Sequence, residues 1–279
     1  MARRQYLLAS HLAWLSRLGV RGDRILLHRS LLSLPFPRSR FAVMLILPLC
    51  FNVLTWLVRR PISNGWAAFF EFWMVKLDLA GSVSMSPIGP RVLDLSLAYL
   101  HLPSEAPNVL MWWLTLSITL FMMMLSLHVP DRLLPLRYLL RFGLFVQLTA
   151  LVFFAIAPGA FPYTISDYIR SVLNSAVWLV MMVPWVHALI YYIFDFSVLQ
   201  KAALTLMTLC FLLAALPFQV MVHAYLLVKG SLLVMPLLYF VFGIWLLMVA
   251  CVALYGWAMS WHRQPVDPDY AEKNTPRPL

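Results

Sequence analysis

Charged residues are scarce in this chain of 279 residues. They make up 11% of it, whereas hydrophobic residues make up 62%. Soluble domains carry about 25% charged residues. A domain folded in water could not cover so much apolar surface, so the composition excludes an ordinary soluble protein and indicates one that lies in a membrane.

Cysteine is also scarce. Cys50, Cys210 and Cys251 each lie within an apolar stretch. No CxxC pair and no His/Cys spacing accompanies them, so we expect neither a disulfide nor a metal site. Free cysteines in such surroundings act as small apolar side chains.

Familiar catalytic motifs are missing as well. The sequence contains no GxSxG, no HExxH, no P-loop and no GxGxxG. No internal repeat of the inverted-transporter kind is evident either. We therefore expect no cofactor, and the sequence favours a protein that is not an enzyme.

Six long apolar stretches dominate what is present. A helix of about 20 apolar residues crosses the hydrocarbon core of a bilayer, and fewer suffice where the bilayer thins. The pattern predicts an all-α polytopic membrane protein with six transmembrane helices. The stretches are Phe41–Val58, Val109–Leu127, Phe142–Ala157, Val172–Phe194, Ala202–Val228 and Leu232–Trp261.

The basic residues are distributed unevenly between the two sides of these stretches. Of the 21 Lys and Arg residues, 15 fall before the first stretch, in alternate loops and in the C-terminal tail, and six fall on the other side. The positive-inside rule then places both termini in the cytoplasm and the loop 59–108 outside. The basic residues behind the net charge of +10 lie outside the apolar stretches, where membrane orientation accounts for them. We therefore expect no nucleic-acid partner. We expect a bacterial inner membrane, and a mitochondrial inner membrane is the alternative.

The segment 1–40 is basic and amphipathic. Leucines recur in it at helical spacing, and a separate stripe carries Arg17, Arg21 and Arg24. This pattern predicts a helix in the headgroup plane with its arginines on anionic lipids. A mitochondrial transit peptide is the rival interpretation, because such peptides are also rich in Arg and poor in acids.

The long loop 59–108 contains two kinds of pattern. Its segment Trp66–Val75 is rich in aromatic residues, which favour the membrane–water boundary. Apolar residues then alternate with polar ones at Val75–Leu79 and Leu93–Tyr99, which predicts a small β-hairpin with its turn at residues 86–90. The hairpin either caps the bundle or docks a partner protein. We expect the tail 262–279 to be disordered.

Polar residues within the apolar stretches are functional candidates, because ionisable groups are costly in hydrocarbon. These candidates are His187, Tyr191, Gln219 and His223. From the rise of a helix, the two histidines lie about 15 Å apart along the bundle. We therefore expect each to bond a neighbouring helix rather than to share a site with the other.

Four charged residues are candidates at the outward face. Asp167 follows Ser166 at the start of the fourth stretch, where Ser166 could cap the helix and the carboxylate would meet its positive end. If the protein were an enzyme, its site would lie among the outward carboxylates. The four candidates are Asp78, Asp94, Asp167 and Arg170.

The sequence favours a non-catalytic multi-pass subunit of a bacterial cell-envelope system for export, polymer synthesis or assembly. We expect it to have a protein partner, either in the membrane or at the outward face. The first alternative is a transporter or channel for a lipid or weakly charged solute. The second is an intramembrane enzyme that acts on a lipid-linked substrate at the outward face.

The predicted topology is tested by cysteine labelling in intact cells. Cysteines placed at Ser84 and Ser104 should react with a membrane-impermeant thiol reagent, and a cysteine at Thr275 should not. The unsubstituted protein gives the background from its own cysteines. The reverse labelling pattern would contradict the orientation.

Overall fold

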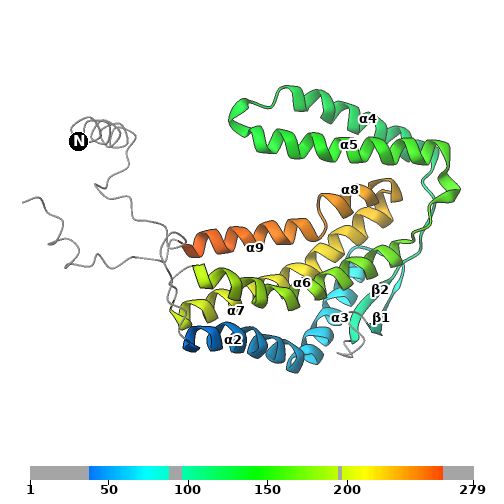
Figure 1. Ribbon diagram of the computed structural model, residues 1–279. Coiled ribbons are helices and arrows are strands. Elements are labelled where there is room, and N and C mark those ends of the chain that lie inside the picture. Colours follow the sequence, from blue (N-terminus) through cyan, green and yellow to red (C-terminus); the bar gives the residue numbers. More distant parts are fainter. Residues whose placement is uncertain (1–37, 88–95, 194–196, 260–279) are drawn as a thin grey trace, which may run out of the picture.

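The computed structural model describes residues 38–87, 96–193 and 197–259, which are mostly helical. The helices are α2 (Arg38–Leu57), α3 (Arg59–Lys76), α4 (Val109–Leu127), α5 (Leu134–Ile156), α6 (Ile165–Ile193), α7 (Val198–Tyr225), α8 (Met235–Phe240) and α9 (Ile244–Ala258). Most of them run side by side along roughly one direction, whereas α3 turns by 54° from α2 (Figure 1). The two strands are β1 (Ser82–Pro87) and β2 (Ser96–His101).

The number of possible membrane crossings is five or six, and the predicted first span Phe41–Val58 is not among the five that qualify alone. Within the described residues, five helical segments are long and apolar enough to cross a membrane, and α2 with α3 makes a sixth if the two count as one broken span. This is consistent with an integral multi-pass membrane protein. The start of α2 and the end of α9 lie at the same end of the bundle, opposite the β-hairpin (Figure 1). We call the two ends the β-hairpin end and the opposite end.

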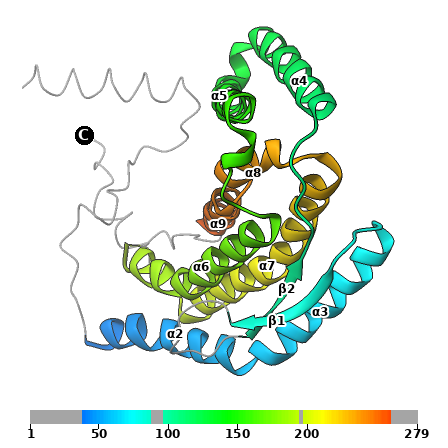
Figure 2. The ribbon, with the colours of Figure 1, turned by 90° about the vertical axis from the view of Figure 1, so that its right-hand side faces the viewer.

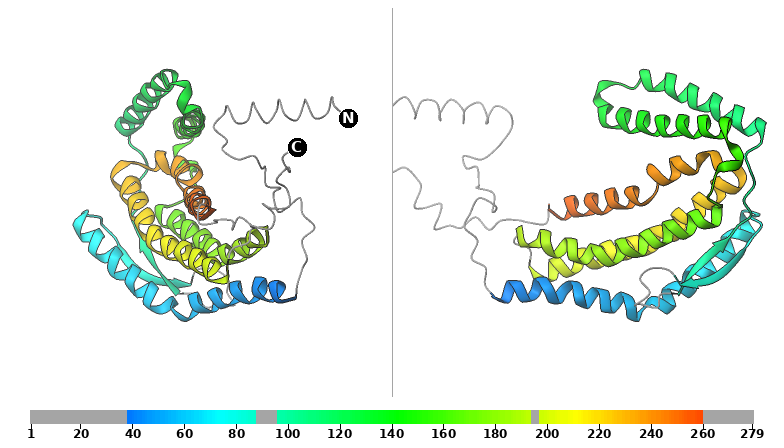
Figure 3. Two further views of the ribbon diagram at one scale, coloured as in Figure 1. Left: turned by 90° about the vertical axis from the view of Figure 1, so that its left-hand side faces the viewer. Right: turned by 45° about the vertical axis from the view of Figure 1, so that its right-hand side comes forward.

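The helices form successive layers. The α2–α3 pair packs on α6 and α7, which pack on α9, and α8 packs on α5. The pair formed by α4 and α5 stands at the far side of this stack, with α8 and α9 between it and α6–α7 (Figures 2 and 3). Helix α4 packs mainly on α5, where the Trp112 indole N–H donates to the Leu151 carbonyl at 3.0 Å.

Three helices begin earlier than the sequence predicted, because local capping extends them. Pro135 occupies the first turn of α5, where its missing N–H needs no partner. Ser197 and Gln200 form a reciprocal capping box at the start of α7. At the start of α6, the Thr164 hydroxyl accepts from the Asp167 N–H, and the Asp167 carboxylate accepts from the Thr164 N–H.

The β-hairpin exists, but its first strand was predicted in the wrong place. Strand β1 pairs antiparallel with β2 in the register Ser82↔His101 to Pro87↔Ser96. The predicted strand Val75–Leu79 instead forms the end of α3 and the turn after it. The reason is that Trp66, Phe70 and Met74 recur every four residues and bury one face of a helix, so the helical period extends into the alternating segment.

Strand β2 is buried on both faces. Its residues Leu97 to Leu100 are all at most 8% exposed, because α3 and α6 both contact the strand. The half-buried strand predicted from alternation is therefore a core strand, whereas β1 is mostly exposed.

The last apolar stretch is not one continuous helix. Helix α8 ends at Phe240 and α9 begins at Ile244. A Cβ at Gly243 would overlap the carbonyl oxygen of Tyr239, so glycine fits this break. The Gln219 amide donates to the carbonyls of Phe242 and Gly243 there. Such bonds are needed because a broken helix in a membrane must satisfy its freed backbone groups.

Some predictions fall outside the described residues. These are the N-terminal helix with Arg17, Arg21 and Arg24, the C-terminal tail, the turn after β1, and Asp94.

Helix α3 is joined to α7 by a hydrogen bond at a proline. Pro217 has no N–H, so the carbonyl of Leu213, four residues earlier, loses its helical partner. The indole N–H of Trp66 donates to this carbonyl at 3.0 Å. Trp66 is itself buried, so one side chain both fills the interface and satisfies the freed backbone group.

We predict that Trp66→Phe lowers the free energy of unfolding by about 0.5–1.5 kcal/mol through this bond, in addition to a smaller packing effect. In a Pro217→Ala background residue 217 regains its N–H, so the same substitution should cost less. Unfolding of the four proteins in mixed micelles measures the difference. An equal effect of Trp66→Phe in both backgrounds would show that the proline-freed carbonyl is irrelevant.

Candidate functional site

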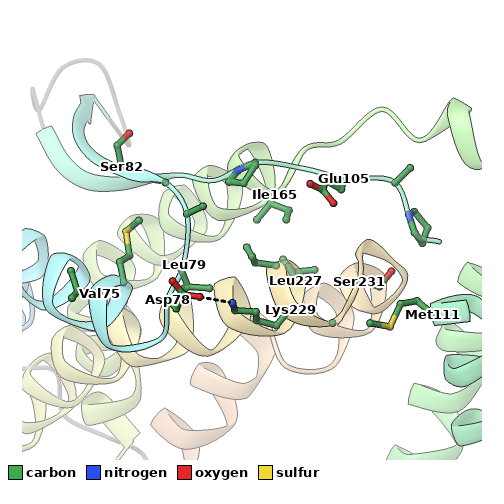
Figure 4. A pocket seen from close by; sticks show the side chains of 18 of the residues that line it. Val75, Asp78, Leu79, Ser82, Glu105, Met111, Ile165, Leu227, Lys229 and Ser231 are labelled. Atoms are coloured by element: carbon green, nitrogen blue, oxygen red, sulfur yellow. Dashed lines mark hydrogen bonds and ion pairs between the residues drawn. The ribbon is translucent and has the colours of Figure 1, made fainter.

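A polar pocket of about 900 Å³ lies at the β-hairpin end (Figure 4). The end of α3 and the turn after it form one wall, and the segment Pro103–Asn108 forms another. The π turn Leu226–Gly230 after α7 lies between them, together with Ser231. Met111 of α4 marks the edge of the pocket toward the α4–α5 pair.

The pocket is lined by three carboxylates and one ammonium. Lys229 lies 3.4 Å from the carboxylate of Asp78. Both side chains are well exposed, so this ion pair contributes little stability. Glu71 and Glu105 also line the pocket, and neither forms an ion pair with a residue that the structure describes. The pocket lining is therefore polar in part, and its charged groups carry an excess of negative charge.

The backbone at Asp78 has a positive φ of 49°. Asp tolerates this left-handed conformation better than most residues. The conformation turns the chain from α3 toward β1 and carries the carboxylate to the pocket. Asp78, predicted as an outward-face candidate, thus lies in the pocket through its backbone conformation.

An apolar crevice of about 510 Å³ lies beside the pocket, between the α4–α5 pair and the segment from Gly230 to Phe242. Leucine, isoleucine, valine and methionine side chains make up most of its lining. Thr115 and Thr119 also line it, but their hydroxyls donate to the carbonyls of Met111 and Thr115 in their own helix, each at 2.7 Å. The crevice therefore presents a mainly apolar surface.

The pocket and the crevice adjoin. Met111, Gly230 and Ser231 line both of them. A polar compartment thus meets an apolar one at the β-hairpin end of α4 and the turn after α7. This arrangement can hold a molecule that has a polar head and an apolar chain.

His223 and Gln219 lie outside the pocket. The Tyr168 hydroxyl and His223 Nδ1 are hydrogen-bonded at 2.7 Å, which links α6 to α7 inside the protein. Gln219 bonds the break between α8 and α9. His223 also hydrogen-bonds the Phe242 backbone at this break, so the two residues of α7 share one contact.

His187 and Tyr191 form a second, separate set with Thr205. The Tyr191 hydroxyl lies 3.0 Å from the Thr205 hydroxyl and 3.3 Å from His187 Nδ1, and it donates to the Lys201 carbonyl at 3.1 Å. This set joins α6 to α7 as well. Among the residues that the structure describes, no three His, Cys, Asp or Glu side chains gather as a metal site would require.

The start of α6 corrects one prediction. Thr164, not Ser166, caps this helix with Asp167. The Ser166 hydroxyl accepts from the Leu102 N–H at 3.0 Å and donates to the Leu102 carbonyl at 3.2 Å. It therefore fixes the chain just after β2. Arg170 is exposed, one turn beyond Asp167 on the same helix.

Sequence reasoning missed Glu71, Glu105, Lys229 and the role of Gln147. The three charged residues lie in different segments, and only the folded chain brings them to one pocket. One sequence feature could have pointed to the pocket, namely the Gly230–Ser231 pair after a long apolar stretch. This pair lies where the helical turn ends and the two cavities meet.

Comparison of the chain with protein-family models, with curated proteins and with solved structures finds no match.

We predict that Tyr168→Phe lowers the free energy of unfolding by about 0.6–2 kcal/mol, because buried His223 loses its hydrogen bond to α6 and hydrogen bonds between membrane helices are worth about that much. Tyr163→Phe is the matched control, since Tyr163 is 60% exposed and should have almost no effect. Unfolding in mixed micelles measures both variants. Equal stability of the two would contradict a structural role for the pair.

Proposed function

We propose that this protein is a non-catalytic multi-pass subunit of a bacterial cell-envelope system for export, polymer synthesis or assembly. Its part in that system is to hold a lipid-linked or other amphiphilic molecule at the outward face of the inner membrane. The head of this molecule occupies the polar pocket, and its chain lies in the apolar crevice.

The continuity of the two cavities carries this proposal. Their volumes, about 900 and 510 Å³, fall in the range of known ligand sites. A water-soluble solute would gain nothing from the crevice, whereas a plain hydrocarbon would gain nothing from the pocket. An amphiphile uses both compartments.

The membrane orientation belongs to the proposal as well. The excess of Lys and Arg on the side of the two termini supports an orientation with the β-hairpin end outside. The pocket then lies near the headgroups of the outer leaflet. The crevice extends from it along α4 and α5, parallel to the lipid chains.

The hydrogen bonds of the buried polar residues support a non-catalytic role. His223 bonds Tyr168, His187 bonds Tyr191 and Thr205, and Gln219 bonds the α8–α9 break. Each candidate from the apolar stretches thus joins helices or satisfies freed backbone. These hydrogen bonds explain why ionisable side chains occur in apolar stretches, where burying them costs free energy.

A lipid transporter is the second candidate. The α4–α5 pair contacts the remaining helices chiefly through α5, so it is the part of the fold best placed to move aside for a passing lipid chain. Reconstitution in vesicles separates the two functions. A transporter moves labelled lipid between the leaflets, whereas a holding subunit binds it without moving it.

We predict that the purified Ile118→Trp variant retains much less bound lipid than the wild type. If binding weakens by ~1 kcal/mol, the dissociation constant rises about fivefold. Ile118 lines the crevice and is 52% exposed, so a larger side chain fills the space without disturbing a packed core. Leu120→Trp is the control, because Leu120 is on the same helix, is 48% exposed and does not line the crevice. Lipid that remains after washing in mild detergent is quantified by mass spectrometry. Equal lipid contents in the two variants would refute the proposal.

A further inference from the structure

One side chain in the crevice has an unused hydrogen-bonding atom. Gln147 of α5 is 4% exposed and lines the crevice. Its amide N–H donates to the carbonyl of Leu233 at 3.0 Å. Its side-chain oxygen has no hydrogen-bond partner among the residues that the structure describes and has almost no accessible surface, so a ligand donor reaches it only when the side chains over it shift.

The orientation of this amide is determined by its neighbour. The Leu233 carbonyl can only accept, so the NH₂ group of Gln147 must face it and the oxygen must be the other end. The nearby hydroxyls of Thr115 and Thr119 donate to their own helix. The oxygen therefore remains an unpaired acceptor in apolar surroundings, which is unfavourable unless something donates to it.

The position of Gln147 relates it to both cavities. Leu233, which holds the amide, follows Ser231 by two residues, and Ser231 lines the pocket as well as the crevice. Gln147 therefore lies near the junction of the two compartments. If an amphiphile has its head in the pocket and its chain in the crevice, the link between head and chain lies nearest to Gln147.

We propose that the Gln147 oxygen accepts a hydrogen bond from the bound lipid, so that the ligand is a lipid with a donor near its head–chain link. The donor is a chain hydroxyl or an amide N–H. A lipid with plain ester-linked chains presents only acceptor oxygens at this level and leaves Gln147 unpaired. This inference rests on the proposed function and narrows its ligand to one chemical class.

The test uses two pairs of probes that differ by one donor. N-palmitoylethanolamine is compared with 2-hydroxyethyl palmitate, which has an ester oxygen in place of the amide N–H. Methyl 3-hydroxypalmitate is compared with methyl palmitate. Binding to the delipidated full-length protein is measured by native mass spectrometry. We expect the donor-bearing member of at least one pair to bind about three- to tenfold more tightly, the ratio produced by one hydrogen bond.

Two variants test the origin of this preference. Gln147→Met keeps the length of the side chain and removes the acceptor, so it should bind both members of each pair equally. Thr149→Val is the control on the same helix, because Thr149 is exposed, does not line the crevice and should leave the preference intact. Ile118→Trp blocks the crevice without changing Gln147 and should also remove the preference, which covers the case in which Gln147→Met does not fold.

The outcomes separate the inference from the proposed function. Equal binding within both pairs by the wild type, or an unchanged preference in Gln147→Met, overturns the inference alone. Absence of binding by all four probes, or binding that Ile118→Trp leaves unchanged, overturns the lipid-holding function itself. A preference for the amide and not the hydroxyl, or the reverse, supports the inference and identifies the donor.

Discussion

The rest of this structure depends on one constraint, which is that backbone groups in hydrocarbon must find hydrogen-bond partners within the protein. The apolar helices contain prolines and a glycine break, and each interruption frees carbonyls. Trp66 satisfies the carbonyl that Pro217 frees, and Gln219 satisfies two at the α8–α9 break. These bonds fix where α3 meets α7 and where the last span bends. The wall of the crevice that runs from Gly230 to Phe242 ends at this bend, so the shape of the site follows from the same constraint.

The same constraint decides what the buried polar side chains do. Two hydrogen-bonded sets join α6 to α7, one around His223 and one around His187. They bind the central helices together and leave the α4–α5 pair at the edge of the stack. The apolar crevice lies at the boundary between this pair and the segment from Gly230 to Phe242. Gln147 and Gln219 differ from these sets, because in each of them only the amide donor is used and the buried oxygen has no partner among the described residues.

The helical fold could be predicted from the sequence because each apolar stretch carries its own signal. The hairpin was only partly predictable. The alternation at Val75–Leu79 fits a strand, but it follows an aromatic helix whose four-residue spacing prevails once β2 covers that face. The cap of α6 was assigned to Ser166 because Ser and Thr caps look alike in sequence, whereas the contact with Leu102 exists only in the fold. Of the charged residues in the pocket only Asp78 was predicted, because Glu71, Glu105 and Lys229 come from separate segments that only packing brings to one pocket.

The two chain segments that attach the α4–α5 pair both lie at the β-hairpin end. One runs from Leu102 to Asn108 along the pocket, and the other runs from Ala157 to Thr164 before α6. The turn between α4 and α5 is at the opposite end, away from these attachments (Figure 3). Both covalent attachments of the pair are therefore beside the pocket. Any outward movement of the pair about them would widen the crevice most at its far end and least beside the pocket. For a lipid held as we propose, such a movement would release the chain while the head stays in place, so the lipid would enter tail first from the side.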